Sequence, residues 1–93
     1  MRKIQRHQVV DSTRIINIPA EYPIVHLALI RDTWYVFYEY TDQRFDHPRM
    51  AHYLVVIDSD EIPDGATHVA SSTAGIVGGW LTLHIYRLAE TDV

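Results

Sequence analysis

Apolar residues recur along this chain with a period of two, not with the 3.6-residue period of an amphipathic helix. β-Branched and aromatic residues fill the alternating segments, and turn residues interrupt them about every eight to twelve residues. The one candidate helical turn, at residues 19–22, is stopped by Pro23. The pattern therefore predicts an all-β chain, a small antiparallel β-sandwich or partly open barrel of about seven strands.

The turn residues divide the chain into expected elements. Strands are expected at residues 3–10, 14–18, 24–30, 33–41, 50–57, 67–73 and 80–88. Residues 1–18 are expected to form an N-terminal hairpin, residues 24–57 the central strands and residues 67–88 a C-terminal hairpin, while residues 89–93 are expected to fray. A chain of 93 residues without cysteine holds one core and no disulfide, so a single domain over residues 1–93 is predicted.

Successive side chains of a strand point to opposite sides, so the pattern also assigns faces. In the third expected strand, Val25, Leu27 and Leu29 are expected in the core. In residues 80–88, alternate aliphatic side chains form a core face, and Trp, Thr, His and Tyr occupy the other face. The strand at residues 33–41 is aromatic on both sides, so some of its rings are expected to lie outside whichever side is buried.

We predict that this outer aromatic face contacts a partner protein or a second copy of the chain, since Trp and Tyr supply a large contact area with a polar handle. A homodimer is the simplest form, because a twofold contact requires only one patch. The alternative is that the rings fill a second small core beneath the N-terminal hairpin. The predicted partner-binding residues are Trp34, Tyr38, Tyr40, Trp80, His84 and Tyr86.

Charge argues against several classes of partner. Eight basic and twelve acidic residues give a net charge of −4, which disfavours a nucleic-acid backbone as the main partner. Arg2, Lys3 and Arg6 could contact nucleic acid or anionic lipid, but a solvated strand end is the simpler interpretation of three charges. No apolar run reaches the roughly 18 residues that span a bilayer, and no signal peptide is evident, so a cytoplasmic protein without a membrane partner is expected.

Histidine is the first candidate for chemistry, with six in the chain. His26, His52 and His84 lie in the middle of expected strands and could converge on a metal ion, yet no His-x-His or His-x-x-x-His pair supports this. Half-buried histidines are the simpler interpretation, so no metal and no cofactor are predicted. The hydroxyls of residues 71–73 have no His–Asp pair at a recognisable offset that would activate them, so no catalytic residue and no enzymatic activity are predicted.

A second hypothesis is an oligomer that captures a nucleotide signal between its subunits. Tyr or Trp would stack on the base, and arginines would pair with the phosphates. The candidate arginines are Arg14, Arg31, Arg44 and Arg49.

Short landmarks follow one another in a particular order along the chain. They are Lys3-Ile4, Ile16-Asn17-Ile18-Pro19, Leu27-Ala28-Leu29, Trp34, Ile62-Pro63, His68-Val69-Ala70-Ser71-Ser72-Thr73 and the closing Trp80-Leu81-Thr82-Leu83-His84-Ile85-Tyr86. In this order they resemble a family of small tailed-bacteriophage proteins with a domain of unknown function. The chain departs from the family pattern at Asp58-Ser59-Asp60, where the family has a Gly-Thr-Gly turn, and at Glu21, where it has Gly.

The resemblance implies a phage or prophage origin and supplies no catalytic residues. Together with the aromatic face, it leads to the main functional expectation. This is a small non-enzymatic accessory protein, located in the host cytoplasm, that binds a host protein to alter host physiology or counter a defence. A minor structural component of the virion is a further alternative, because β-sandwiches are common scaffolds.

Overall fold

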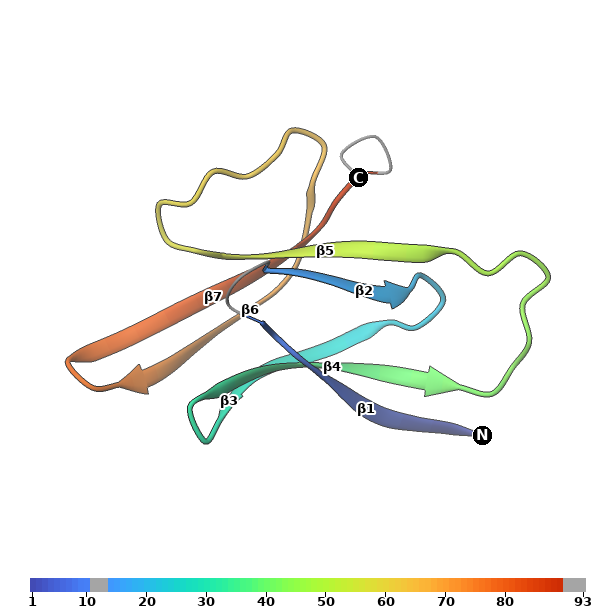
Figure 1. Ribbon diagram of the computed structural model, residues 1–93, viewed down its shortest axis with the longest axis horizontal. Helices are drawn as coiled ribbons and strands as arrows, with labels where there is room; N and C mark the ends of the chain where they lie inside the picture. The colour runs from blue at the N-terminus through green and yellow to red at the C-terminus, as the bar shows by residue number, and fades with distance from the viewer. Residues whose placement is uncertain (11–13, 90–93) are drawn as a thin grey trace.

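The computed structural model describes residues 1–10 and 14–89, which form seven strands in two antiparallel sheets (Figure 1). The first sheet has the order β1-β4-β3 and the second the order β2-β5-β7-β6. The all-β prediction is confirmed, and the two sheets do not join into a closed barrel. The strands are β1 (Arg2–Gln8), β2 (Ile15–Pro19), β3 (Ile24–Ile30), β4 (Thr33–Thr41), β5 (Met50–Ile57), β6 (Thr67–Ile76) and β7 (Gly79–Arg87).

Two of the expected features cannot be compared with the structure. The turn at residues 11–13 and the fraying tail at residues 90–93 lie outside the described residues. Over the described part of the chain, no helix has the length and apolar character needed to cross a membrane.

The predicted N-terminal hairpin is wrong. β1 pairs with β4 and β2 pairs with β5, so the two strands lie in different sheets. The side chains explain this separation: six of the seven residues of β1 are polar and suit a solvated sheet edge, whereas β2 presents Ile16 and Ile18 to the core. The expected central strands are also divided between the sheets, because β3 and β4 belong to the first sheet and β5 belongs to the second. The C-terminal hairpin is formed as predicted, by β6 and β7.

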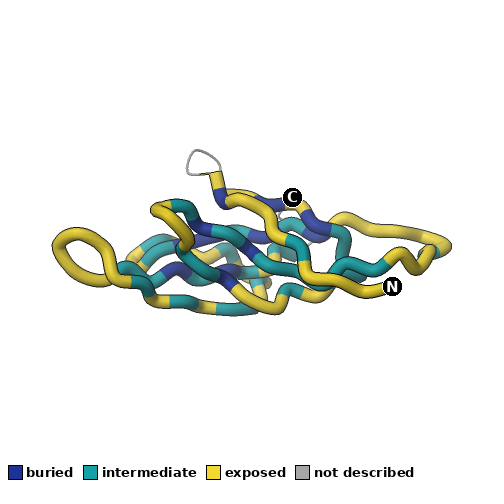
Figure 2. The backbone as a smooth tube through the Cα atoms, turned by 90° about the horizontal axis from the view of Figure 1, so that it is seen from below, coloured by how far each residue is buried: buried dark blue, intermediate teal, exposed yellow. Residues whose placement is uncertain are grey.

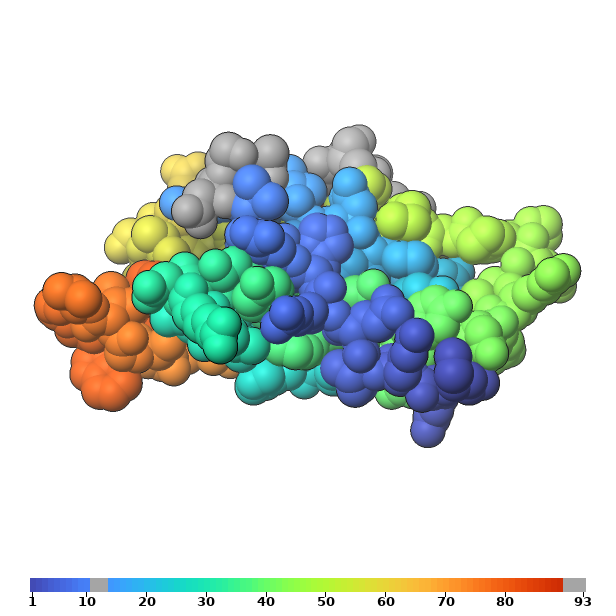
Figure 3. Space-filling view, turned by 60° about the horizontal axis from the view of Figure 1, so that its bottom comes forward, coloured from blue at the N-terminus to red at the C-terminus, as the bar shows by residue number. Residues whose placement is uncertain are grey.

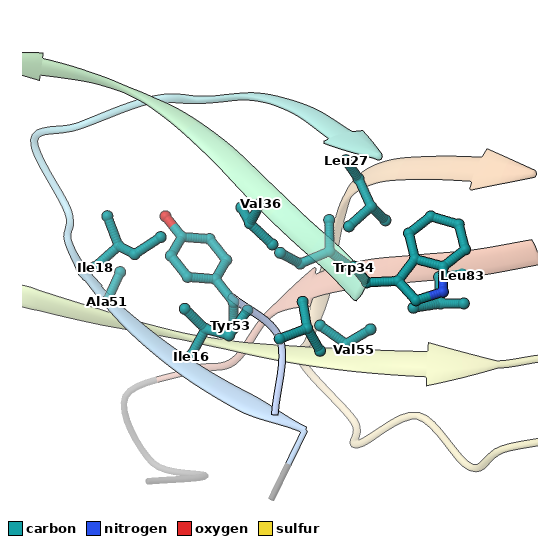
Figure 4. Close-up of a cluster of buried hydrophobic side chains, with 11 residues drawn as sticks. Ile16, Ile18, Leu27, Trp34, Val36, Ala51, Tyr53, Val55 and Leu83 are labelled. Atoms are coloured by element: carbon teal, nitrogen blue, oxygen red, sulfur yellow. The ribbon is translucent and has the colours of Figure 1, made fainter. Parts of the chain in front are cut away.

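The core lies between the two sheets, where alternate side chains of both meet (Figure 4). Its buried members are Val9, Ile16, Ile18, Leu27, Trp34, Val36, Ala51, Tyr53, Val55, Leu83 and Ile85. The molecule is thin and elongated, with extents of 48 × 31 × 20 Å. Figure 2 shows that the buried positions occupy its middle, while the loops at both ends of the long axis are exposed.

A β-bulge in β3 overturns one of the predicted core positions. The pairing with β4 shifts between Ile24 and His26, so the strand holds one extra residue there. A bulge interrupts the alternation of faces. Leu27 and Leu29 pack into the core as predicted, but Val25 is 47% exposed and Ile24 packs against the core in its place.

Candidate functional site

The six predicted partner-binding residues do not share one surface. Trp34 is only 9% exposed and lies beside Leu83 in the core (Figure 4). The prediction that Trp34 contacts a partner is therefore wrong. The reason is that β4 is the central strand of its sheet, and the face that carries Trp34 and Val36 turns toward the second sheet.

Tyr38 and Tyr40 continue this inner face toward the end of β4, where they form a cluster with Tyr22. The rings of Tyr22 and Tyr38 stack at 5.9 Å between centroids, and the Tyr40 ring meets Tyr22 edge-on at 5.4 Å. The Tyr38 hydroxyl donates to Gln5 Oε1 at 3.1 Å. Removal from water, with smaller contributions from Tyr40 and Tyr38, raises the pKa of Tyr22. These tyrosines pack against one another as a second small core rather than forming a free surface.

Trp80, His84 and Tyr86 lie on the outer face of the second sheet, as predicted, because the alternate residues of β7 face the core. Trp80 is 79% exposed and stands opposite Gly75 in the β6–β7 pairing. A ring carbon of Trp80 lies 3.6 Å from the position that a Cβ on Gly75 would occupy, so the indole rests against the bare backbone of β6.

Two further exposed apolar residues lie at the same end of the hairpin, Ile76 at the end of β6 and Val77 in the loop. Ile76 is 44% exposed and Val77 is fully exposed. Gly78 and Gly79 follow with φ of 91° and 151°, backbone conformations that favour glycine. We call Ile76, Val77 and Trp80 the hairpin tip. This apolar group lies at one end of the long axis, away from the core (Figures 1 and 2).

A row of polar side chains crosses the same outer face nearer the middle of the sheet. His84 Nε2 lies 3.2 Å from Asp58 Oδ1, and His84 Nδ1 lies 2.6 Å from Ser71 Oγ. Ser71 Oγ is in turn 2.7 Å from His68 Nε2. We call Asp58, His84, Ser71 and His68 the polar row. Tyr86 closes its end, with its ring edge-on to His68 at 5.3 Å between centroids.

Three local features bring these residues together. β6 and β7 are joined by a two-residue loop, which sets Ser71 opposite His84. A bulge between His68 and Ala70 turns His68 to the same side as Ser71, although residues three apart in a regular strand point to opposite sides. The turn after β5 presents Asp58 beside β7.

That turn is held by Asp60. The Asp60 N–H donates to the Ile57 carbonyl at 3.2 Å, and Asp60 Oδ2 accepts the Ile57 N–H at 2.9 Å. The same oxygen accepts a hydrogen bond from Arg14 Nη1 at 2.7 Å, so the segment before β2 also braces the turn.

With both imidazoles neutral, one assignment of protons satisfies every bond of the row. His84 Nε2–H donates to Asp58, the Ser71 hydroxyl donates to His84 Nδ1, and His68 Nε2–H donates to Ser71. This is the order of groups in a Ser-His-Asp triad with the two histidine nitrogens exchanged. The row therefore holds its four polar side chains in a fixed order on one face of the hairpin.

The proton assignment predicts the tautomer of each ring. When each ring carries a single proton, we expect that proton on Nε2 of His84 and on Nε2 of His68. Long-range proton–nitrogen NMR spectra distinguish the two tautomers directly. An Asp58→Asn variant serves as the comparison, because it removes the carboxylate that accepts the His84 proton. A His84 ring protonated on Nδ1 in the native protein would contradict the arrangement.

The other sequence candidates lie apart from the polar row. His26 is on the first sheet, and His52 contacts the Asn17 side chain near the far end of β5. Within residues 1–10 and 14–89, no group of three or more histidine, aspartate or glutamate side chains could hold a metal ion. The four candidate arginines are likewise not gathered at one place: Arg14 precedes β2, Arg31 lies in the β3–β4 turn, and the other two lie between β4 and β5.

Sequence reasoning missed the polar row because its members come from three separate segments. One signal was present: a two-residue loop at Val77 and Gly78 would place Ser71 opposite His84 in any regular hairpin. The bulge that adds His68 has no comparable signal in the sequence. Comparisons of the chain with protein-family models, with curated proteins and with solved structures give no match.

Proposed function

We propose that this protein is a small non-enzymatic accessory protein that binds a partner protein through the outer face of the β6–β7 hairpin. The observation that supports this most strongly is the hairpin tip, where Trp80 is 79% exposed on the outer face and Val77 is fully exposed in the adjoining loop. Trp side chains are enriched among the residues that dominate binding energy, and burying Trp80 and Val77 would remove two apolar side chains from water.

The surroundings of the tip fit a contact surface. Trp80 would form the apolar centre, while the polar row and Tyr86 would form a hydrogen-bonding margin on the same face. His84 and Ser71 are already ordered by hydrogen bonds, so less side-chain entropy would be lost when a partner binds.

The resemblance to tailed-phage proteins supports a partner from the host. In this proposal the protein is phage-encoded, acts in the host cytoplasm and alters host physiology or counters a defence by occupying a host protein. The alternative is that the protein self-associates through the same tip, because a twofold contact between two copies would also bury Trp80.

A Trp80→Ala variant tests the proposal in a pull-down from host lysate. We expect the captured host protein to be lost, because truncating a central aromatic contact weakens binding by about 2 kcal/mol or more, roughly 30-fold. Ile4→Ala is the matched control: Ile4 is 56% exposed on the opposite sheet, so this variant should retain the partner. Both variants should melt within a few degrees of the native protein.

The proposal fails if Trp80→Ala and Ile4→Ala capture the same host protein equally well. Light scattering after size-exclusion chromatography tests the alternative of self-association. A native dimer that becomes a monomer in Trp80→Ala would assign the tip to self-association rather than to a host protein.

A further inference from the structure

We propose that the outer face of the first sheet binds the phosphate group of a small phosphate monoester. The site is a hollow with a volume of about 450 Å³ beside the β3–β4 turn, and it is lined by Arg6, Ile30, Arg31, Thr33 and Tyr35. It lies on the opposite sheet from the hairpin tip and is independent of the proposed partner. In Figure 3, β1 and the β3–β4 turn lie side by side on the face turned forward.

Two guanidinium groups line the hollow without a carboxylate partner. Among the described residues, no aspartate or glutamate forms an ion pair with Arg6 or Arg31. Arg2, by contrast, is paired with Glu39 at 2.9 Å on the same face. Two unpaired guanidiniums in one hollow favour a doubly charged anion, because each can donate two parallel hydrogen bonds to phosphate oxygens.

Arg6 is already held in place for such a contact. Its guanidinium carbon lies 4.5 Å from the centroid of the Tyr35 ring, a cation–π distance. A guanidinium held over a ring keeps its N–H donors available for a second partner. The Arg6 guanidinium covers one face of the Tyr35 ring. The ring therefore orients the arginine, and that face cannot stack on a nucleobase.

Arg31 lies where the backbone favours a different residue. Arg31 and Asp32 form the two-residue turn between β3 and β4, with φ of 49° and 65°. Glycine and asparagine adopt this left-handed conformation more readily than arginine does. Residues in unfavourable backbone conformations cluster at ligand sites. An arginine at this turn position is therefore consistent with a guanidinium that binds a ligand.

The remaining lining indicates what is attached to the phosphate. Thr33 and Tyr35 each bring a hydroxyl group, and Ile30, which is 37% exposed, gives an apolar wall for an organic group. The net charge of −4 disfavours a long polyanion such as nucleic acid. The combination points to a small molecule with one phosphate and an apolar portion.

Phenyl phosphate is the probe that tests this site. In a proton–nitrogen NMR titration at constant ionic strength, we expect saturable shifts at the Arg6 and Arg31 Nε–H groups and at the Tyr35 amide. Arg31→Gln should weaken the binding about tenfold or more, because it removes charge-assisted hydrogen bonds. Arg44→Gln removes the same charge from the segment between β4 and β5 and should leave the affinity unchanged.

Inorganic phosphate distinguishes the role of the organic group: it should bind at the same residues but more weakly than phenyl phosphate. Native-like spectra of both variants, recorded before titration, show that each is folded. The proposal is overturned if Arg44→Gln weakens binding as much as Arg31→Gln does, if the shifts map to Arg2 and Lys3 instead, or if no saturable shift occurs. None of these outcomes affects the test of Trp80.

Discussion

Replacing Trp34 with alanine is expected to lower the free energy of unfolding by about 3–5 kcal/mol. The indole is 9% exposed and lies between the sheets, and Leu27 and Val55 are also members of its cluster (Figure 4). Removing it leaves a cavity that a sandwich of paired strands cannot close by local movement. A small domain has a total stability of about 5–15 kcal/mol, so this single change removes a large part of it.

Urea unfolding followed by far-ultraviolet circular dichroism measures the Trp34→Ala effect. The matched control is Trp80→Ala, which removes the same side chain from an exposed position and should change the stability by no more than about 0.5 kcal/mol. Equal losses in the two variants would contradict the division between a buried and an exposed tryptophan, and with it the description of the hairpin tip.

The second large effect is expected at Ile85, which is a fully buried residue of β7. It stands opposite Val55 on one side and Ala70 on the other, so its side chain joins three strands of the second sheet. We expect Ile85→Val to cost about 0.5–1.5 kcal/mol and Ile85→Ala about 2–5 kcal/mol, because the cavity grows with each group removed.

Chemical denaturation of the two Ile85 variants tests this gradation. Val77→Ala, at a fully exposed position in the loop of the same hairpin, is the control and should be nearly neutral. A loss at Ile85→Ala no larger than that at Val77→Ala would place the core elsewhere. While the protein remains folded, neither Ile85 variant should alter the hydrogen bonds of the polar row.

The division between core and outer face of β7 could be predicted from the sequence. Leu83 and Ile85 alternate with His84 and Tyr86, and a strand must point such residues to opposite sides. The same reasoning placed Leu27 and Leu29 correctly, yet it failed for Val25, where a bulge interrupts the alternation. The alternation of apolar and polar residues predicts which side a residue faces only where the strand pairing is regular. A bulge depends on how the strand pairs with its neighbour, which the alternation does not show.

The candidate site was predicted in part. Trp80, His84 and Tyr86 were placed on the outer face because a single strand determines their direction. Trp34, Tyr38 and Tyr40 were assigned to that surface wrongly, because the aromatic strand has rings on both sides and the sequence does not show which side meets the second sheet. Trp34 is buried because its face of β4 is turned toward the second sheet.

By itself, the sequence determined the all-β class, the approximate strand positions and the C-terminal hairpin, since these depend on residues close together in the chain. Only the tertiary structure decided that β1 and β2 enter different sheets, that Trp34 is buried and that Asp58 joins His84 in the polar row. Each of these depends on the pairing of strands distant in the sequence. Such pairing is selected by the burial of whole faces, and local pattern does not encode it.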